Sequence, residues 1–135
     1  MAGLLPLRVL VAALFSRIDL MGHVMDIIET IKEQIENNDI LLYMKGSPNQ
    51  PQCGFSARTT QALMSCGERF AYVDILSNPE IREHLPKYAN WPTFPQLWVK
   101  GELIGGCDIV TEMFETGELQ QLVKEAAVTT QDEPE

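Results

Sequence analysis

The stretch ILLYMKGSPNQPQCGFS, residues 40–56, contains the change of pattern that decides the fold. Residues 40–44 form a continuous apolar run of strand length, which is typical of a strand buried on both faces. A loop with one glycine and two prolines follows. From Gly54 to about Cys66 the pattern predicts a helix that ends at Gly67, because glycine is common just past a helix C-terminus. The stretch therefore predicts a strand, a loop and a helix in this order.

Periodicity and turn residues predict one helix before this stretch, and a strand and a helix after it. Apolar residues recur at helical spacing over about residues 24–37, with Glu and Lys between them, and this pattern predicts an amphipathic helix. Residues 70–75 predict a second strand. The sequence Ser77-Asn78-Pro79-Glu80 is typical of a helix start, with capping side chains, an early proline and an acid in the first turn. We expect this helix to be short, with Pro86 ending it.

The C-terminal part predicts a hairpin and then helices. Two short apolar strands, at about residues 96–99 and 102–104, are joined by Lys100-Gly101, a two-residue connection suited to a hairpin. Gly105-Gly106 leads into a helical region in which Gly117 marks a break.

This order of elements predicts the fold class. The β-α-β portion implies a right-handed crossover and a parallel pair of strands, and the hairpin adds antiparallel strands. The economical arrangement is an α/β protein with a four-stranded mixed sheet flanked by helices on both faces. That is a thioredoxin-like fold.

Composition limits the classes of function. The chain has 135 residues, the length of one domain, and carries 10 Lys and Arg against 19 Asp and Glu, a net charge of −9. The acidic balance argues against nucleic-acid binding, which needs a basic surface. No apolar run reaches the length of a membrane-spanning helix, so we expect no membrane association. Three cysteines do not suit a secreted disulfide scaffold, which indicates a reducing compartment.

The two ends differ in composition from the middle. Residues 1–22 are interpreted as an N-terminal extension: a disordered segment, a targeting segment, or the product of a misassigned start. Residues 23–127 form the predicted domain, and residues 128–135 are expected to be an acidic disordered tail. We expect a cytoplasmic location, or the mitochondrial or plastid matrix if residues 1–22 are a transit peptide.

Cys53 is the candidate functional residue. It lies at the start of the predicted helix, where unpaired backbone N–H groups and the helix dipole favour an anion. A thiol there tends to have a lowered pKa, and its thiolate is both a nucleophile and a metal ligand. A cysteine that only packs at a helix start is the alternative. Lys45 ends the preceding strand, and the Phe94-Pro95 bond, if cis, would leave the backbone of Phe94 free to pair with an extended peptide.

Several segments together resemble one family. Cys53-Gly54-Phe55-Ser56 is similar to the C-G-F-S active site of monothiol glutaredoxins. Four other segments fall where that family has them: Lys45-Gly46, Trp91-Pro92, Thr93-Phe94-Pro95 and Gly105-Gly106-Cys107-Asp108. The resemblance covers about residues 24–126 and is closest to the short, single-domain bacterial and organellar members.

The active-site motif limits the chemistry. In dithiol enzymes a second cysteine, one helical turn after the first, resolves the mixed disulfide. Ser56 occupies that position, and a hydroxyl cannot form a disulfide, so this motif cannot carry out the two-cysteine cycle. Two options remain: a monothiol cycle with glutathione as the second thiol, or metal ligation by the Cys53 thiolate.

The resemblance implies a glutathione site. Lys45 and Arg82 would pair with the glycyl carboxylate, and the backbone of Phe94 would bond the cysteinyl portion. Gly106, Cys107 and Asp108 would receive the γ-glutamyl end. We read Cys66 as a core residue, whereas Cys107 keeps a resolving-thiol role as an alternative to a backbone role.

The resemblance also implies a [2Fe-2S] cluster between two subunits, with Cys53 of each chain and one glutathione per chain as the four sulfur ligands. The sequence holds no CxxC pair. The expected partners are a second copy in the cluster-bound homodimer, a BolA-type protein and apo iron–sulfur proteins. The competing function is a weak glutathione-dependent thiol–disulfide oxidoreductase, and a third is an adaptor with an inert Cys53. The loop 46–52, longer in this family than in dithiol relatives, favours the cluster carrier.

Overall fold

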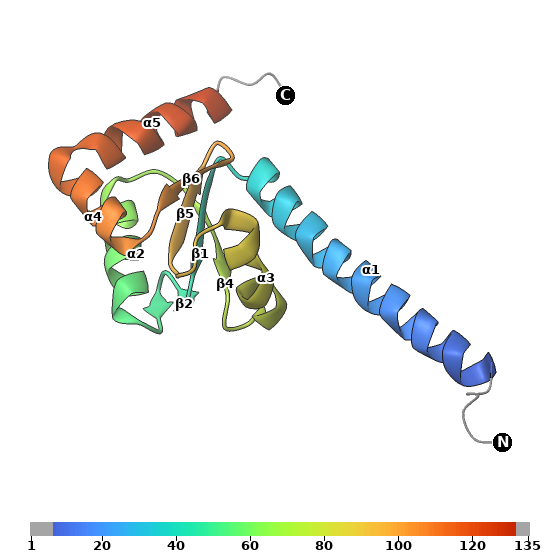
Figure 1. Ribbon diagram of the computed structural model, residues 1–135. Helices are drawn as coiled ribbons and strands as arrows, with labels where there is room; N and C mark the ends of the chain where they lie inside the picture. Colours follow the sequence, from blue (N-terminus) through green and yellow to red (C-terminus); the bar gives the residue numbers. More distant parts are fainter. Residues whose placement is uncertain (1–6, 132–135) are drawn as a thin grey trace.

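A single mixed sheet organises the computed structural model, which describes residues 7–131 (Figure 1). The strand order is β4-β1-β5-β6; β1 pairs parallel with β4 and antiparallel with β5, and β5 pairs antiparallel with β6. The strands are β1 (Ile40–Met44), β4 (Ala71–Asp74), β5 (Gln96–Val99) and β6 (Glu102–Gly105). The predicted thioredoxin-like fold is confirmed.

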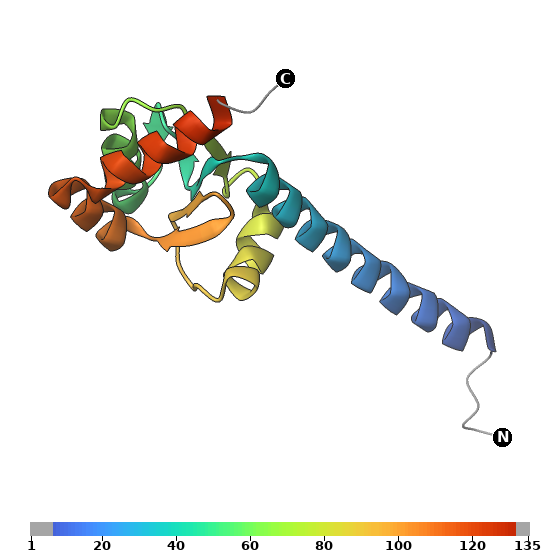
Figure 2. The ribbon, with the colours of Figure 1, turned by 90° about the horizontal axis from the view of Figure 1, so that it is seen from above.

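Helices cover both faces of the sheet. The helices are α1 (Leu7–Asn37), α2 (Gly54–Ser65), α3 (Pro79–Ala89), α4 (Cys107–Thr116) and α5 (Glu118–Gln131). Helices α1 and α3 lie against one face, and α2, α4 and α5 against the other (Figure 2). None of the helices within residues 7–131 combines the length and the apolar character needed to cross a membrane.

The core consists of two layers that share strand β1. Leu42 and Met44 pack with α2, α4 and α5, whereas Leu41 and Tyr43 pack with α1 and α3. All five residues of β1 are buried. Because both faces of this central strand meet helices, the sequence shows a continuous apolar run there instead of alternation.

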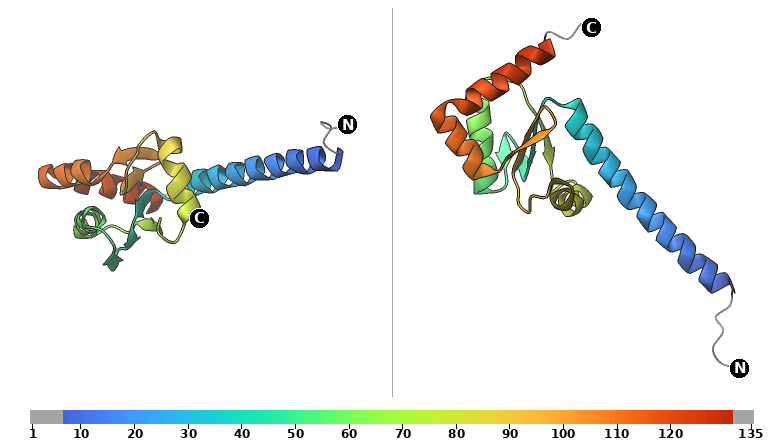
Figure 3. Two further views of the ribbon diagram at one scale, coloured as in Figure 1. Left: turned by 60° about the horizontal axis from the view of Figure 1, so that its bottom comes forward. Right: turned by 45° about the horizontal axis from the view of Figure 1, so that its top comes forward.

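Helix α1 is longer than the sequence predicts. It begins at Leu7, not near residue 24, and its N-terminal half projects away from the sheet (Figures 1 and 3). Residues 7–21 contain neither glycine nor proline, so nothing in them interrupts a helix. Residues 7–22 are therefore helical and not disordered; the targeting role stays a prediction, and residues 1–6 lie outside the described residues. At the other end α5 reaches Gln131, so residues 128–131 of the expected tail are also helical, and residues 132–135 again lie outside.

Pro86 does not end α3, contrary to prediction. The helix continues to Ala89 and closes with Asn90 in the left-handed conformation, at φ 52°. The N–H of Trp91 then donates to the Pro86 carbonyl at 3.0 Å. Leu85 is fully buried beside this proline, and packing of that kind outweighs the loss of one hydrogen bond inside the helix.

The loop before Cys53 is an ordered hairpin that the sequence did not predict. Strands β2 (Gly46–Ser47) and β3 (Gln50–Pro51) pair with each other, and the N–H of Gln52 donates to the Lys45 carbonyl at 2.8 Å. Gly46 has a φ of +90°, and a Cβ atom there would lie 2.5 Å from the carbonyl oxygen of Gln50. Only glycine allows this close approach.

Candidate functional site

Cys53 is the N-cap of α2. Its backbone is extended, with φ −153° and ψ 153°, and its sulfur accepts the N–H of Ser56 at 3.3 Å. The first N–H groups of a helix have no partner within it, so an anion at the N-cap is stabilised there. Cys53 is only partly buried, which leaves the residue open to a ligand or reactant from solvent.

The buried hydroxyl of Ser56 connects Cys53 to the end of β1. It accepts the backbone N–H of Lys45 at 3.1 Å and the S–H of the Cys53 thiol at 3.5 Å; when the thiol is ionised, the hydroxyl donates to the sulfur instead. Burial raises the pKa of Cys53, but hydrogen bonds from the Ser56 hydroxyl and the N–H groups of Ser56 and Phe55, with the charge of Lys45, outweigh it and hold that pKa below its ordinary value. The thiolate form is therefore favoured.

Asp74, at the end of β4, holds the beginning of the hairpin in place. Its Oδ1 atom accepts the N–H groups of Gly46 and Leu76, both at 2.9 Å, and its Oδ2 atom accepts the Ser77 hydroxyl at 3.0 Å. Slight burial raises the pKa of Asp74, but these hydrogen bonds outweigh it and leave the pKa lower than usual. Asp74 thus connects the segment after Lys45 to the loop that begins α3.

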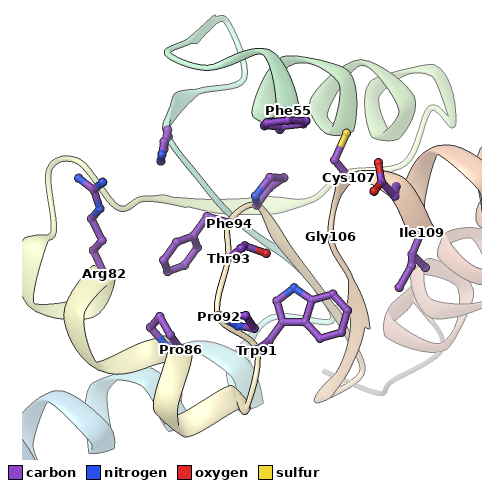
Figure 4. A pocket seen from close by; sticks show the side chains of 13 residues that line it. Phe55, Arg82, Pro86, Trp91, Pro92, Thr93, Phe94, Gly106, Cys107 and Ile109 are labelled. Carbon is purple, nitrogen blue, oxygen red and sulfur yellow. The ribbon is translucent and has the colours of Figure 1, made fainter.

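A groove of about 680 Å³ is lined by Phe55, two residues after Cys53; Cys53 itself is not among the residues that line it. Such a volume is in the range of small-molecule sites. All the residues predicted to bind a ligand line it: Lys45, Arg82, Phe94, Gly106, Cys107 and Asp108. Figure 4 shows Arg82 and Cys107 on opposite sides of this groove and the 91–94 segment between them.

The two sides differ in charge. Lys45 and Arg82 contribute cations, from the end of β1 and from α3. Across the groove, Gly106 is the N-cap of α4 and Asp108 is in its first turn. The free N–H groups of a helix's first turn can bind an anion, and a carboxylate can bind a cation. A ligand with a carboxylate at one end and an amino acid group at the other fits this distribution.

The wall between the two sides is the segment 91–95. The Phe94-Pro95 peptide bond is cis, the isomer on which the expected role of the Phe94 backbone depended. Gly106 approaches this wall closely, since a Cβ atom there would lie 3.2 Å from the carbonyl oxygen of Pro95.

Comparison with known proteins identifies the family. The model of the Glutaredoxin family matches residues 40–104. Glutaredoxin 4 of Escherichia coli (strain K12) is 74% identical over 100 residues, which are 74% of this chain and 87% of that protein. The chain belongs to the glutaredoxin family. With C-G-F-S at residues 53–56, it is of the monothiol type.

Other relatives agree with this assignment. Glutaredoxin 4 of Haemophilus ducreyi is 66% identical over 103 residues, covering 76% of this chain and 96% of that protein. Among solved structures, reduced apo GrxS14 of poplar is 44% identical, with a TM-score of 0.63, covering 73% of this chain and 90% of that one.

The other two cysteines of this glutaredoxin are not placed like Cys53. Burial and the charge of Glu68 raise the pKa of Cys66, whose thiol donates to the Ala62 carbonyl at 3.3 Å. Cys107 is buried, with its sulfur 3.9 Å from the Thr111 hydroxyl. Within residues 7–131, no group of three or more His, Cys, Asp or Glu side chains is arranged to hold a metal ion.

Sequence reasoning missed part of the groove. Ile109 lines it, and so does Trp91, for which the sequence predicted no role in ligand binding. It also missed Gln96, whose buried side chain bonds to the 91–95 wall. A signal existed for Gln96, because it is the polar residue of an otherwise apolar strand, Gln96–Val99.

Proposed function

We propose that this glutaredoxin binds glutathione in the groove and, with it, carries a [2Fe-2S] cluster at a homodimer interface for transfer to apo-proteins in iron–sulfur cluster assembly. One observation carries the proposal. The N-cap thiol of Cys53 lies two residues before Phe55, which lines a groove with separated charges, and the buried hydroxyl of Ser56 lies where a dithiol enzyme has its second thiol.

The groove suits glutathione in volume and charge. Lys45 and Arg82 would bind the glycyl carboxylate, and the backbone of Phe94 would pair with the cysteinyl residue as a strand does. Gly106 and Cys107 would hold the γ-glutamyl carboxylate through their N–H groups, while Asp108 accepts from its ammonium. The glutathione thiol would then lie near Cys53.

The donor set supports a cluster shared between chains. A [2Fe-2S] cluster takes four sulfur ligands, and Cys53 supplies one thiolate from each chain. Two glutathione thiolates would complete the set, because the thiols of Cys66 and Cys107 are hydrogen bonded to Ala62 and Thr111. Ligands that are not covalently attached make such a cargo exchangeable, which suits a carrier.

The proposal includes partners and a compartment. We propose apo iron–sulfur proteins as recipients and a BolA-type protein as a heterodimer partner, in the cytoplasm. The recipients and the heterodimer partner follow from the resemblance of the 53–56 and 105–108 segments to the monothiol family.

Reconstitution tests the proposal directly. The protein is incubated anaerobically with iron, sulfide and glutathione, and its absorption spectrum and native mass are recorded. We expect a dimer with sulfur-to-iron charge-transfer bands that disappear without glutathione or in Cys53→Ser, while the control Cys66→Ser keeps them. A colourless monomer would refute the carrier function.

The lowered pKa of Cys53 favours a second function, the reduction of protein–glutathione mixed disulfides. The Cys53 thiolate would attack the glutathione sulfur, and the released protein thiolate would take up a proton. A second glutathione thiolate would then attack the Cys53–glutathione disulfide, which releases oxidised glutathione and restores Cys53. Turnover of a glutathionylated protein in a glutathione-reductase-coupled assay tests this function; its absence would leave only the carrier.

A further inference from the structure

Gln96 is a fully buried polar side chain directly behind the groove. It is the first residue of β5 and has no exposed surface. Its Nε2 atom donates to the carbonyl oxygens of Trp91 at 3.1 Å and Thr93 at 3.3 Å, and its Oε1 atom accepts the indole N–H of Trp98 at 3.2 Å. One side chain thus joins the sheet to both ends of a three-residue segment.

The partners define the orientation of the Gln96 amide. An indole N–H can only donate and a backbone carbonyl can only accept, so the oxygen must face Trp98 and the nitrogen must face the segment. A buried amide in this setting uses both of its N–H groups and its oxygen, and every lost bond would leave a buried partner unsatisfied.

The segment held in this way is the wall of the groove. Residues 91–95 all line it, and Phe94 lies directly after the bonded Thr93 carbonyl. Flexible segments lose conformational entropy when a ligand orders them, whereas a segment already held does not.

We propose that Gln96 is a positioning residue that holds the 91–95 wall in its glutathione-binding conformation. The inference rests on the proposed glutathione site and adds to it a residue that does not touch the ligand. Ordering the backbone of a single residue costs roughly a tenfold factor in an equilibrium constant, so loss of this anchor should weaken glutathione binding about tenfold.

The equilibrium between Cys53 and glutathione disulfide measures this effect. The Cys53 thiol and glutathione disulfide give the Cys53–glutathione mixed disulfide and one free glutathione. Mass spectrometry of the intact protein at known ratios of reduced to oxidised glutathione gives the equilibrium constant of this exchange. We expect Gln96→Met to lower the constant about tenfold. Trp98→Phe keeps Gln96 and removes the donor that orients its amide, together with part of a buried core ring, so we expect about a threefold decrease.

Gln96→Glu gives a readout that depends on the protonation of the introduced group. The introduced carboxylate accepts from Trp98 but cannot donate to the Trp91 and Thr93 carbonyls, whereas its protonated form donates to one of them. We therefore expect the ratio of the wild-type constant to the Gln96→Glu constant to fall as the pH is lowered from 7.5 to 5. Protonation also relieves the destabilisation caused by a buried carboxylate, so the constants are compared only at pH values at which urea unfolding shows the variant to be fully folded.

The control variant is Tyr43→Phe. Tyr43 lies opposite Gln96 on the neighbouring strand, and its hydroxyl donates to Gln34 of α1 at 2.8 Å, away from the groove. The proposal is overturned if every folded variant of Gln96 and Trp98 keeps the constant within twofold of Tyr43→Phe. If Asp108→Asn and Arg82→Gln also leave the constant unchanged, the glutathione site itself is wrong; if those two lower it, only the role of Gln96 is wrong.

Discussion

The substitution Gly46→Ala tests whether the hairpin before Cys53 requires glycine at this position. Gly46 has a φ of +90°, and an added Cβ atom would lie 2.5 Å from the Gln50 carbonyl oxygen and 2.9 Å from the Gln52 nitrogen. Both are backbone atoms, so no side-chain rotation relieves the collision. The hairpin must open, and with it the hydrogen bond from the Gln52 N–H to the Lys45 carbonyl.

Two contributions determine the expected loss. A non-glycine residue in the left-handed region costs about 1–3 kcal/mol, and each hydrogen bond lost on opening the hairpin adds about 1 kcal/mol. Gly67→Ala is the matched control, because Gly67 has a φ of +80° and nothing within 4 Å of an added Cβ atom. Gly67→Ala is therefore destabilised by the backbone strain alone. The loss in free energy of unfolding should be about 1–3 kcal/mol greater for Gly46→Ala.

Urea unfolding followed by tryptophan fluorescence measures the difference. With a slope of about 1–3 kcal/mol per molar urea, the unfolding midpoint of Gly46→Ala should lie about 1 M below that of Gly67→Ala. Equal midpoints for the two variants would show that the collision at Gly46 is relieved without cost, and would refute the reasoning.

Three further predictions concern the thiol, the acid range and the core. Ser56→Ala removes a hydrogen bond to the Cys53 sulfur, so the pKa of Cys53 should rise and the pH profile of its alkylation by iodoacetamide should move upward; the exposed Ser65→Ala should not move it. The pKa of Asp74 is lowered in the folded state, so its stabilising effect is complete above the unfolded pKa of about 3.9 and is lost as pH falls below it, and Asp74→Asn should flatten the acid limb of the stability curve. Leu85→Ala, at a fully buried position, should lower the free energy of unfolding by about 2–5 kcal/mol in urea, whereas the exposed Leu76→Ala should change it by no more than about 0.5 kcal/mol.

Each of these predictions has an opposing outcome. An unchanged alkylation profile in Ser56→Ala would mean that the hydroxyl does not stabilise the thiolate. An Asp74→Asn variant that loses stability below pH 4 as steeply as wild type would assign the acid limb to other carboxylates. Similar losses for Leu85→Ala and Leu76→Ala would contradict the burial of Leu85 between α3 and the sheet.

Much of the fold was predictable because its signals are local. The run at residues 40–44 has only apolar side chains because both faces of the strand are covered. Lys100 and Gly101 form the predicted turn, each with a positive φ. The prediction at Pro86 was wrong because the packing of Leu85 acts across elements and outweighs a local propensity.

The site was predictable only in part. The family motif indicated Cys53 and six groove residues, but it gave no reason for Asp74 or Gln96, which act by joining segments that are distant in the chain. The Asp74 carboxylate joins β4 to Gly46, 28 residues away. Such contacts depend on strand register, and a sequence without its fold does not contain that register in readable form.

The amino-acid sequence by itself determined the element order, the mixed sheet and the position of Cys53 at a helix start, because turn residues, periodicity and helix caps act over a few residues. Only the tertiary structure decided how far α1 and α3 extend, that residues 46–51 form a hairpin, and that Lys45, Arg82 and Asp108 face one groove. These features depend on contacts between segments far apart in the chain, whose energies arise from packing and hydrogen bonds that exist only once the sheet has formed.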